Sequence, residues 1–156
     1  MITRSIVGQR LRDMPTYQTE FDNNNEAEVA DWLSKCWRCE IKSFGPFSNV
    51  DWYMKRNGRL IGIAELKCRS FSYTKYQTVF ISVTKWFHLI HGHFGLGVPA
   101  VFIIRFTDQV RWIDVFHIDA TRHSIKGRKD RGPNSTSIEP AIEIPIDQMT
   151  IVSFVE

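Results

Sequence analysis

Three residues of types that support metal-assisted hydrolysis lie within a short stretch of the chain, namely Asp51, Glu65 and Lys67. Successive side chains of a β-strand alternate between its two faces, so Glu65 and Lys67 share one face if they stand on a strand. Two neighbouring carboxylates repel each other and are costly to desolvate, so a cation is expected beside them. Carboxylate oxygens favour a hard ion, so we expect Asp51 and Glu65 to hold Mg²⁺ or Mn²⁺.

Lys67 cannot bind a cation, but its ammonium group can serve the same reaction. It can orient or help to deprotonate an attacking water, and it can stabilise negative charge that grows on a phosphate. A metal ion would polarise the same phosphate, so these residue types indicate phosphodiester hydrolysis. The alternative is a solvent-exposed ion pair between Glu65 and Lys67, since a Glu-x-Lys sequence alone is common.

A β-hairpin is expected to carry these residues. Its predicted arms are residues 50–55 and 59–69, and Asn57-Gly58 between them is the strongest turn signal of the chain. On the second arm, Ile61 and Ile63 are expected to share a face with the charged residues. The two arms are therefore predicted to be central strands of the sheet.

The length of the turn decides on which face Asp51 lies. A two-residue turn would pair Asp51 with Ala64 and place it on the face opposite to Glu65. A three-residue loop, with Gly58 left-handed in a G1 bulge, would pair Asp51 with Ile63 and return it to the face of Glu65. We therefore predict the three-residue loop, with the two carboxylates as diagonal neighbours roughly 7–8 Å apart at Cα.

A helix is predicted over residues 25–37, where apolar residues recur at helical spacing after a polar run that offers caps. Glu26 precedes Val29 by three residues and Leu33 by seven, so it shares their core-facing stripe. An inward glutamate is unfavourable without a partner. We therefore predict that Glu26 joins the metal site or orders water, and Glu28, on a more solvated face, is the alternative.

The rest of the pattern predicts an α/β fold, a single-domain mixed β-sheet flanked by helices. The further predicted elements are a strand at 40–44, a helix at 81–92, strands at 100–106 and 110–118, and a last strand at 142–146. The apolar run at 100–106 is typical of a strand covered on both faces. Pro145 indicates that the last strand lies at an edge. The predicted single nuclease domain spans 1–156, with a core at about 22–118, a basic loop at about 122–137 and a C-terminal edge strand at about 140–155.

The basic loop lacks periodicity and is rich in positive charge, although the net charge of the chain is only +3. Such a patch suits contact with backbone phosphates without reading of sequence. A solvated loop is the alternative interpretation. The DNA-binding residues predicted in this loop are Arg122, Lys126, Arg128, Lys129 and Arg131. Lys85, outside the loop, is predicted to contact a phosphate as well, with a polar helix face as the alternative.

Composition excludes several other classes of protein. The chain has 156 residues, 43% of them apolar, which suits one globular domain rather than a disordered or fibrous chain. No window reaches the roughly 18 apolar residues of a membrane span, and the N-terminus lacks the apolar run of a signal peptide. We expect no membrane partner and a cytoplasmic location. Cys36 and Cys39 have zinc-binding spacing, but no second ligand pair accompanies them.

The sequence resembles the PD-(D/E)XK nuclease superfamily over roughly residues 22–118. The residues that carry the resemblance are Glu26, Asp51, Glu65 and Lys67. The resemblance implies a core with the order α-β-β-β-α-β, catalytic Lys67, and a metal site formed by Asp51, Glu65 and the carbonyl of Leu66. Val50 departs from the family pattern, which has a proline before the aspartate.

Within the superfamily, the helix pattern and short length look most like Holliday-junction resolvases and small phage-type endonucleases. This resemblance implies a magnesium-dependent DNA endonuclease that prefers branched DNA and acts as a homodimer. The compact chain would fit a virus-encoded enzyme that acts in a host cell. Two alternatives stay open: a restriction-like or repair nuclease or exonuclease on linear duplex, and a nuclease-fold DNA-binding module that has lost cleavage.

Overall fold

The computed structural model describes residues 23–128 and 137–153. In chain order, the elements are α2 (Asn23–Trp37), β1 (Glu40–Ser43), β2 (Trp52–Arg56), β3 (Arg59–Cys68), β4 (Thr78–Ser82), α3 (Val83–Leu96), β5 (Ala100–Arg105), β6 (Val110–Asp114), η1 (Val115–His117), β7 (His123–Arg128), β8 (Ser137–Pro145), η2 (Ile146–Gln148) and β9 (Thr150–Ile151). Among the described residues, no helix has the length and apolar character needed to cross a membrane.

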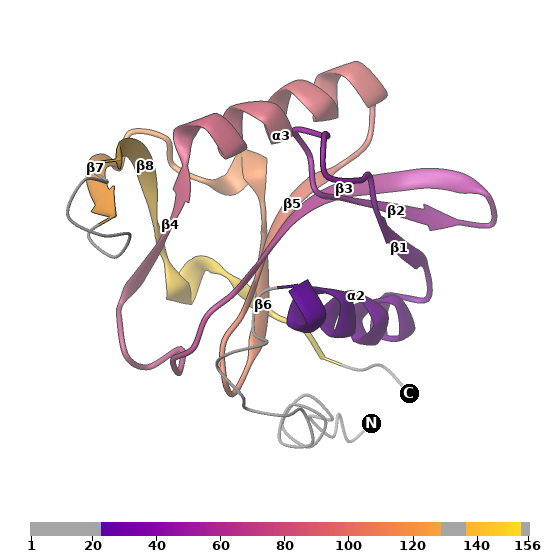
Figure 1. The fold of residues 1–156 in the computed structure, drawn as a ribbon, viewed down its shortest axis with the longest axis horizontal. Helices are drawn as coiled ribbons and strands as arrows, with labels where there is room; N and C mark the ends of the chain where they lie inside the picture. Colours follow the sequence, from indigo (N-terminus) through magenta and orange to yellow (C-terminus); the bar gives the residue numbers. More distant parts are fainter. Residues whose placement is uncertain (1–22, 129–136, 154–156) are drawn as a thin grey trace.

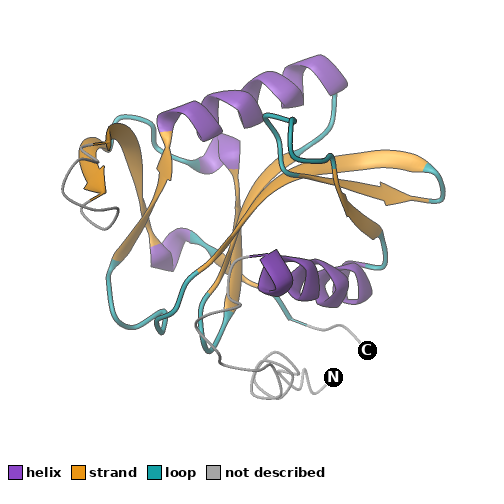
Figure 2. Ribbon diagram, in the orientation of Figure 1, coloured by secondary structure: helices purple, strands orange, loops and turns teal. Residues whose placement is uncertain are grey.

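The main sheet contains six strands in the order β1-β2-β3-β5-β6-β9. β3 and β5 pair in parallel, and the other neighbouring strands of this sheet are antiparallel. Parallel neighbours need a long crossover, which β4 and α3 supply. Helices α2 and α3 lie on opposite faces of the sheet (Figures 1 and 2). The predicted mixed sheet flanked by helices, with the core order α-β-β-β-α-β, is confirmed.

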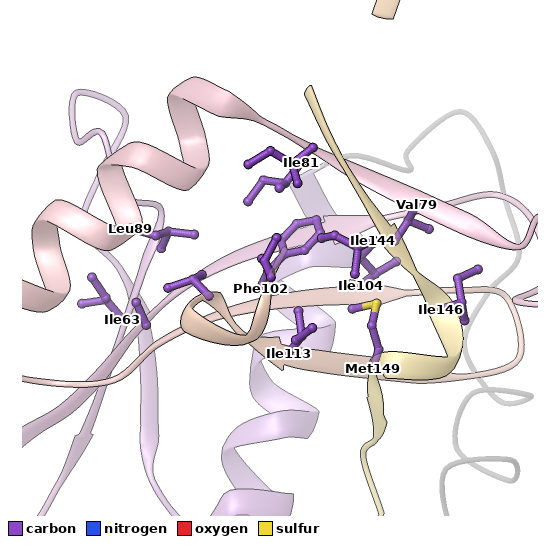
Figure 3. Packing of buried hydrophobic residues seen from close by; sticks show 14 of the residues in the cluster. Ile63, Val79, Ile81, Leu89, Phe102, Ile104, Ile113, Ile144, Ile146 and Met149 are labelled. Carbon is purple, nitrogen blue, oxygen red and sulfur yellow. The ribbon is translucent and has the colours of Figure 1, made fainter. Parts of the chain in front are cut away.

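The two faces of the sheet carry separate hydrophobic clusters. On the α3 face, Ile63, Leu89 and Phe102 pack together with residues of β4 and β8 (Figure 3). On the α2 face, Val29 and Leu33 belong to the second cluster, with apolar residues of β3 and β5. All six residues of β5 are buried, as its continuous apolar run predicts. β3 and β5 are thus rigid central strands, suited to hold functional side chains.

The predicted three-residue hairpin loop is wrong. Arg56 pairs with Arg59, so the turn consists of Asn57 and Gly58 alone. Both have positive φ, at 52° and 75°, as a type I′ turn requires. The register shifts further along the hairpin, where Ile61 has no partner on β2 and forms a β-bulge.

This bulge moves Ile61 to the other side of the sheet. Ile61 packs against the α2-side cluster while Ile63 belongs to the α3-side cluster, so the prediction that they share a face is wrong. Gly62 makes the close approach possible, because a Cβ there would collide with Cε of Met54. The correct face for the functional residues is thus reached through a bulge within β3 and not through the turn.

The predicted basic loop and C-terminal strand also differ from the structure. β7 extends through part of residues 122–137, and β8 is the centre of a second sheet with the order β4-β8-β7. The last strand predicted from Pro145 is therefore not an edge strand; β9 is the edge strand of that region. Pro145 pairs only with β4, and Pro140 only with β7. Each proline is tolerated because β8 is paired on one side alone at that position.

Candidate active site

Four polar side chains meet on the α3 side of the main sheet. Glu65 and Lys67 alternate along β3 with the α2-facing Leu66, as strand geometry predicts. Asp51 immediately precedes β2, and the pairing of Trp52 with Ala64 brings it beside Glu65. The fourth side chain is Lys85 of α3. The sequence predicted that the two acids would be diagonal neighbours. The bulge instead places them directly beside each other.

The distances define a compact ionic group. Nζ of Lys67 lies 3.2 Å from Oε1 of Glu65, and Nζ of Lys85 lies 3.0 Å from Oδ1 of Asp51. Lys85 is also 3.5 Å from Oε2 of Glu65, so it bridges the two acids. The side chain of Glu65 is only 1% exposed, whereas Lys67 is 36% exposed. Lys67 is therefore the member of the β3 pair that a substrate can reach from solvent.

Burial gives the two acids different protonation behaviour. Burial, reinforced by a hydrogen bond with Asp51, raises the pKa of Glu65 to about 7, against the charges of Lys67 and Lys85. Burial also opposes ionisation of Asp51, but hydrogen bonds with Glu65 and Lys85 lower its pKa below the usual value. Asp51 is thus the ionised member of the pair at neutral pH, and Glu65 readily keeps a proton in the absence of further positive charge.

The donor set suits a hard metal ion. Oε1 of Glu65 is buried and accepts no hydrogen bond, although Lys67 is near, so it has bonding capacity left for a cation. The backbone N–H groups of Ile63 and Arg69 donate to the carbonyls of Pro99 and Arg105, on the β5 side of β3. Backbone groups of a strand alternate between its two edges, so the carbonyl of Leu66 points to the β2 side, beyond the start of β2. Among the described residues, no group of three or more His, Cys, Asp or Glu side chains could hold a metal. The candidate ligands are two carboxylates, those of Asp51 and Glu65, with the backbone carbonyl of Leu66 as the third.

Glu26 approaches this group from the other helix. It lies in the first turn of α2, is partly exposed, and lines a surface hollow together with Asp51 and Trp52. Glu28 is exposed and does not line that hollow. The structure therefore brings Glu26 toward Asp51, at the rim of the site and not within the acidic pair.

The predicted DNA-binding residues fall in different places. Lys85 lies in the first turn of α3 and donates a hydrogen bond to Asp51. Arg122 is exposed and precedes β7, while Lys126 and Arg128 belong to that strand. Lys129 and Arg131 lie outside the described residues.

Sequence reasoning missed the position of Lys85 between the two acids. One signal was present, because Lys85 falls in the first turn of α3, where the helix dipole disfavours a cation. A lysine at such a position needs a compensating anion. The identity of that anion depends on the packing of α3 against β3 and on the residue that precedes β2, which no local pattern contains.

The fold and the site define a nuclease of the PD-(D/E)XK type: a mixed sheet between two helices, with an acid before β2 and Glu-x-Lys on β3. The family model described as "Phage putative PDDEXK endonuclease" matches residues 12–152, and the chain belongs to this family. The resemblance seen in the sequence is thereby confirmed.

A solved structure supports the fold independently. Hjc from Archaeoglobus fulgidus, described as a Holliday junction resolvase from an archaeal hyperthermophile, is similar with a TM-score of 0.54 and 12% identity. The match covers 83% of this chain and 90% of that chain. At this identity the likeness shows a shared fold. No curated protein matches the sequence significantly.

Proposed function

We propose that this nuclease is a divalent-metal-dependent DNA endonuclease whose site is formed by Glu26, Asp51, Glu65 and Lys67. The observation that carries the proposal is the pairing of Asp51 with buried Glu65, with Lys67 only 3.2 Å from the Glu65 carboxylate. Glu65 is costly to ionise in its buried position beside Asp51, and a bound divalent cation would favour the ionised form of both acids. A domain that only binds DNA has no need of such a pair.

Each residue has a distinct role in this proposal. Asp51, Glu65 and the Leu66 carbonyl hold Mg²⁺ or Mn²⁺, which when bound polarises the phosphate and lowers the pKa of water. Lys67, 36% exposed beside Glu65, orients the attacking water and stabilises charge on the phosphate. Glu26, at the rim of the hollow shared with Asp51, orders water that enters the site.

Basic residues beyond the site hold the DNA backbone in this proposal. They are Arg122, Lys126, Arg128, Lys129 and Arg131. Part of this set lies on β7, which belongs to the small sheet that packs on the same face of the main sheet as α3. A strand offers regularly spaced side chains on a fixed backbone, and contacts to phosphates need no base reading.

Branched DNA and a homodimer complete the proposal. Support for branched DNA comes from the fold shared with a protein described as a Holliday junction resolvase. Support for a homodimer comes from exposed apolar side chains on α3 and η1, chiefly Phe87 and Phe94 of α3 and Phe116 of η1, all at least 47% exposed; the rings of Phe94 and Phe116 are in contact. Exposed aromatic side chains are enriched at protein interfaces. Two copies would present two sites to two strands of a junction.

The phage family supports a virus-encoded enzyme that acts inside a host cell.

The test is cleavage of matched linear, nicked, flapped and four-way DNA with Mg²⁺, for wild type, Glu65→Ala and Lys67→Ala. Lys35→Ala is a matched control, because Lys35 forms an exposed ion pair with Asp31 on α2, at 3.2 Å. Symmetric nicks in the four-way substrate alone, lost in both site variants and kept in the control, support the proposal. Equal cutting of linear DNA indicates a duplex nuclease. Binding without any product indicates an inactive DNA-binding module.

A further inference from the structure

Lys85 occupies the position between the two acids that the proposed metal site requires. Its Nζ lies 3.0 Å from Oδ1 of Asp51 and 3.5 Å from Oε2 of Glu65. Lys67 contacts the other oxygen of Glu65. Two carboxylates thus face two ammonium groups, and the bridging charge comes from the protein itself.

The position of Lys85 is fixed by the start of α3. Ser82 caps this helix by accepting a hydrogen bond from the backbone N–H of Lys85, at 3.1 Å. The first turn contains no acidic residue that could pair with Lys85 locally. Its side chain is 32% exposed, so the ammonium group has a route toward solvent along its flexible stem. Lys85 can therefore both neutralise the acids and leave them.

We propose that Lys85 is a built-in counterion that competes with the divalent metal ion for Asp51 and Glu65, and that it withdraws when the ion binds. This inference rests on the proposed function, because it takes the acidic pair as the metal site. An ammonium group and a metal ion cannot both bridge the same two carboxylates at contact distance, since their charges repel each other. Metal binding therefore includes the loss of both Lys85 contacts.

The proposal also gives a place for Lys85 once it is displaced. An ammonium group released beside the acidic pair is close to where the phosphate of bound DNA must lie, and phosphate is a suitable partner for lysine. Metal ion and DNA would then each favour the binding of the other, as linkage requires of coupled sites. In DNA-free protein, Lys85 keeps the acids neutralised and the metal affinity low.

Calorimetric titration of DNA-free protein with Mn²⁺ tests the proposal. Lys85→Met is expected to bind the ion at least about tenfold more tightly than wild type, which corresponds to about 1.4 kcal/mol. Its melting temperature in EDTA is expected to fall, because the two acids lose their shared counterion. Lys85→Arg, which keeps the charge, should retain weak binding. Lys35→Met, which removes only the exposed partner of Asp31, should leave both quantities unchanged.

The outcomes separate this inference from the proposed function. Equal or weaker Mn²⁺ binding by Lys85→Met, with clear binding by wild type, overturns the competition and leaves the metal site in place. Absence of binding in wild type and in Lys85→Met overturns both. Binding by wild type that Asp51→Asn does not weaken places the ion elsewhere and also overturns both.

A measurement on wild type covers the case in which Lys85→Met does not fold. Acetylation of lysines, read by mass spectrometry, should leave Lys85 protected in EDTA and modify it faster once Mn²⁺ is added. Lys35, exposed in its surface pair, is the internal reference and should react equally under both conditions. Unchanged protection of Lys85 at saturating Mn²⁺ contradicts its withdrawal.

Discussion

Asp51 and Glu65 lie side by side because β3 contains one residue more than β2 between the hairpin turn and the site. With a regular two-residue turn and no bulge, Asp51 would pair with Ala64 and face the α2 side. The unpaired Ile61 shifts the register, so that Trp52 pairs with Ala64 and Asp51 reaches Glu65. The acidic pair therefore depends on a backbone irregularity located near the other end of the hairpin.

Replacement of Lys67 is predicted to remove cleavage while leaving the fold intact. Lys67→Ala should lower the single-turnover rate by about 10²–10⁴-fold, the usual contribution of a positioned acid–base or charge-stabilising group. Loss of its contact with Glu65 should leave the fold intact, because the buried Glu65 carboxyl can take up a proton when Lys67 is absent. Cleavage rates and chemical denaturation, measured on the same preparation, check both statements. Cleavage that survives in Lys67→Ala would remove this residue from the mechanism.

Metal-free stability is predicted to fall as pH rises from about 4.5 to about 7. Folding raises the pKa of Glu65 from the ordinary 4.5 to about 7, with Asp51, Lys67 and Lys85 as its charged neighbours. The folded state then binds a proton that the unfolded state releases, so this stability is complete below pH 4.5 and is lost as pH rises through 7. The slope is at most about 1.4 kcal/mol per pH unit.

Glu65→Gln is the matched variant for this pH effect, because its amide keeps the shape of the carboxyl group and cannot titrate. Urea denaturation in EDTA across this pH range should give a flat profile for Glu65→Gln and a falling one for wild type. Added Mg²⁺ should offset the loss in wild type, because it stabilises the ionised carboxylate. Parallel profiles for the two proteins would show that Glu65 does not carry the effect.

Gly62 is predicted to be required at the bulge. A Cβ at this position would collide with Cε of Met54, so Gly62→Ala should destabilise the protein by about 1–3 kcal/mol, as overpacking of a core does. Met54→Ala should relieve part of this effect in the double variant, since the collision involves the tip of a flexible side chain. Gly95→Ala, where a Cβ meets nothing within 4 Å, is the control in chemical denaturation. Equal stability of both single variants would contradict the packing argument.

The basic residues near β7 are predicted to bind DNA through charge alone. Arg122→Ala and Lys126→Ala should each weaken binding of linear and branched DNA by the same factor. Each should also reduce the slope of log affinity against log salt concentration by about 0.9, the value for one phosphate contact. Fluorescence anisotropy at several salt concentrations measures this slope. A loss confined to branched DNA would instead assign these residues to recognition of the junction.

The apolar surface of α3 and η1 is predicted to form the dimer contact. Phe94 is 70% exposed, and its ring contacts those of His93 and Phe116, so Phe94→Asp should separate the subunits without unfolding them. Sedimentation velocity measures the change. Phe47→Asp is the matched control, because Phe47 is fully exposed and lies on the loop between β1 and β2, outside α3 and η1. A monomeric wild type would show that the homodimer proposal is wrong.

The sequence by itself determined the class of fold and the candidate residues. Helical spacing over 25–37 identifies α2, because a helix buried on one face has a periodic apolar pattern. The continuous apolar run after residue 100 identifies β5, because a strand buried on both faces is apolar throughout. Glu65 and Lys67 share a face wherever they stand on a strand. These features depend on neighbours along the chain, so local spacing contains them.

The tertiary structure alone decided how the site is assembled. The bulge at Ile61 lets Ile61 pack in the cluster on the α2 face and Ile63 in the cluster on the α3 face. This arrangement exists only because both faces of the sheet are covered. β8 accepts its prolines because two short partners pair with different parts of it. Lys85 reaches Asp51 across 34 positions of sequence, since the start of α3 lies beside the residue that precedes β2. Contacts between distant segments depend on which surfaces pack together, and this information is absent from any local pattern.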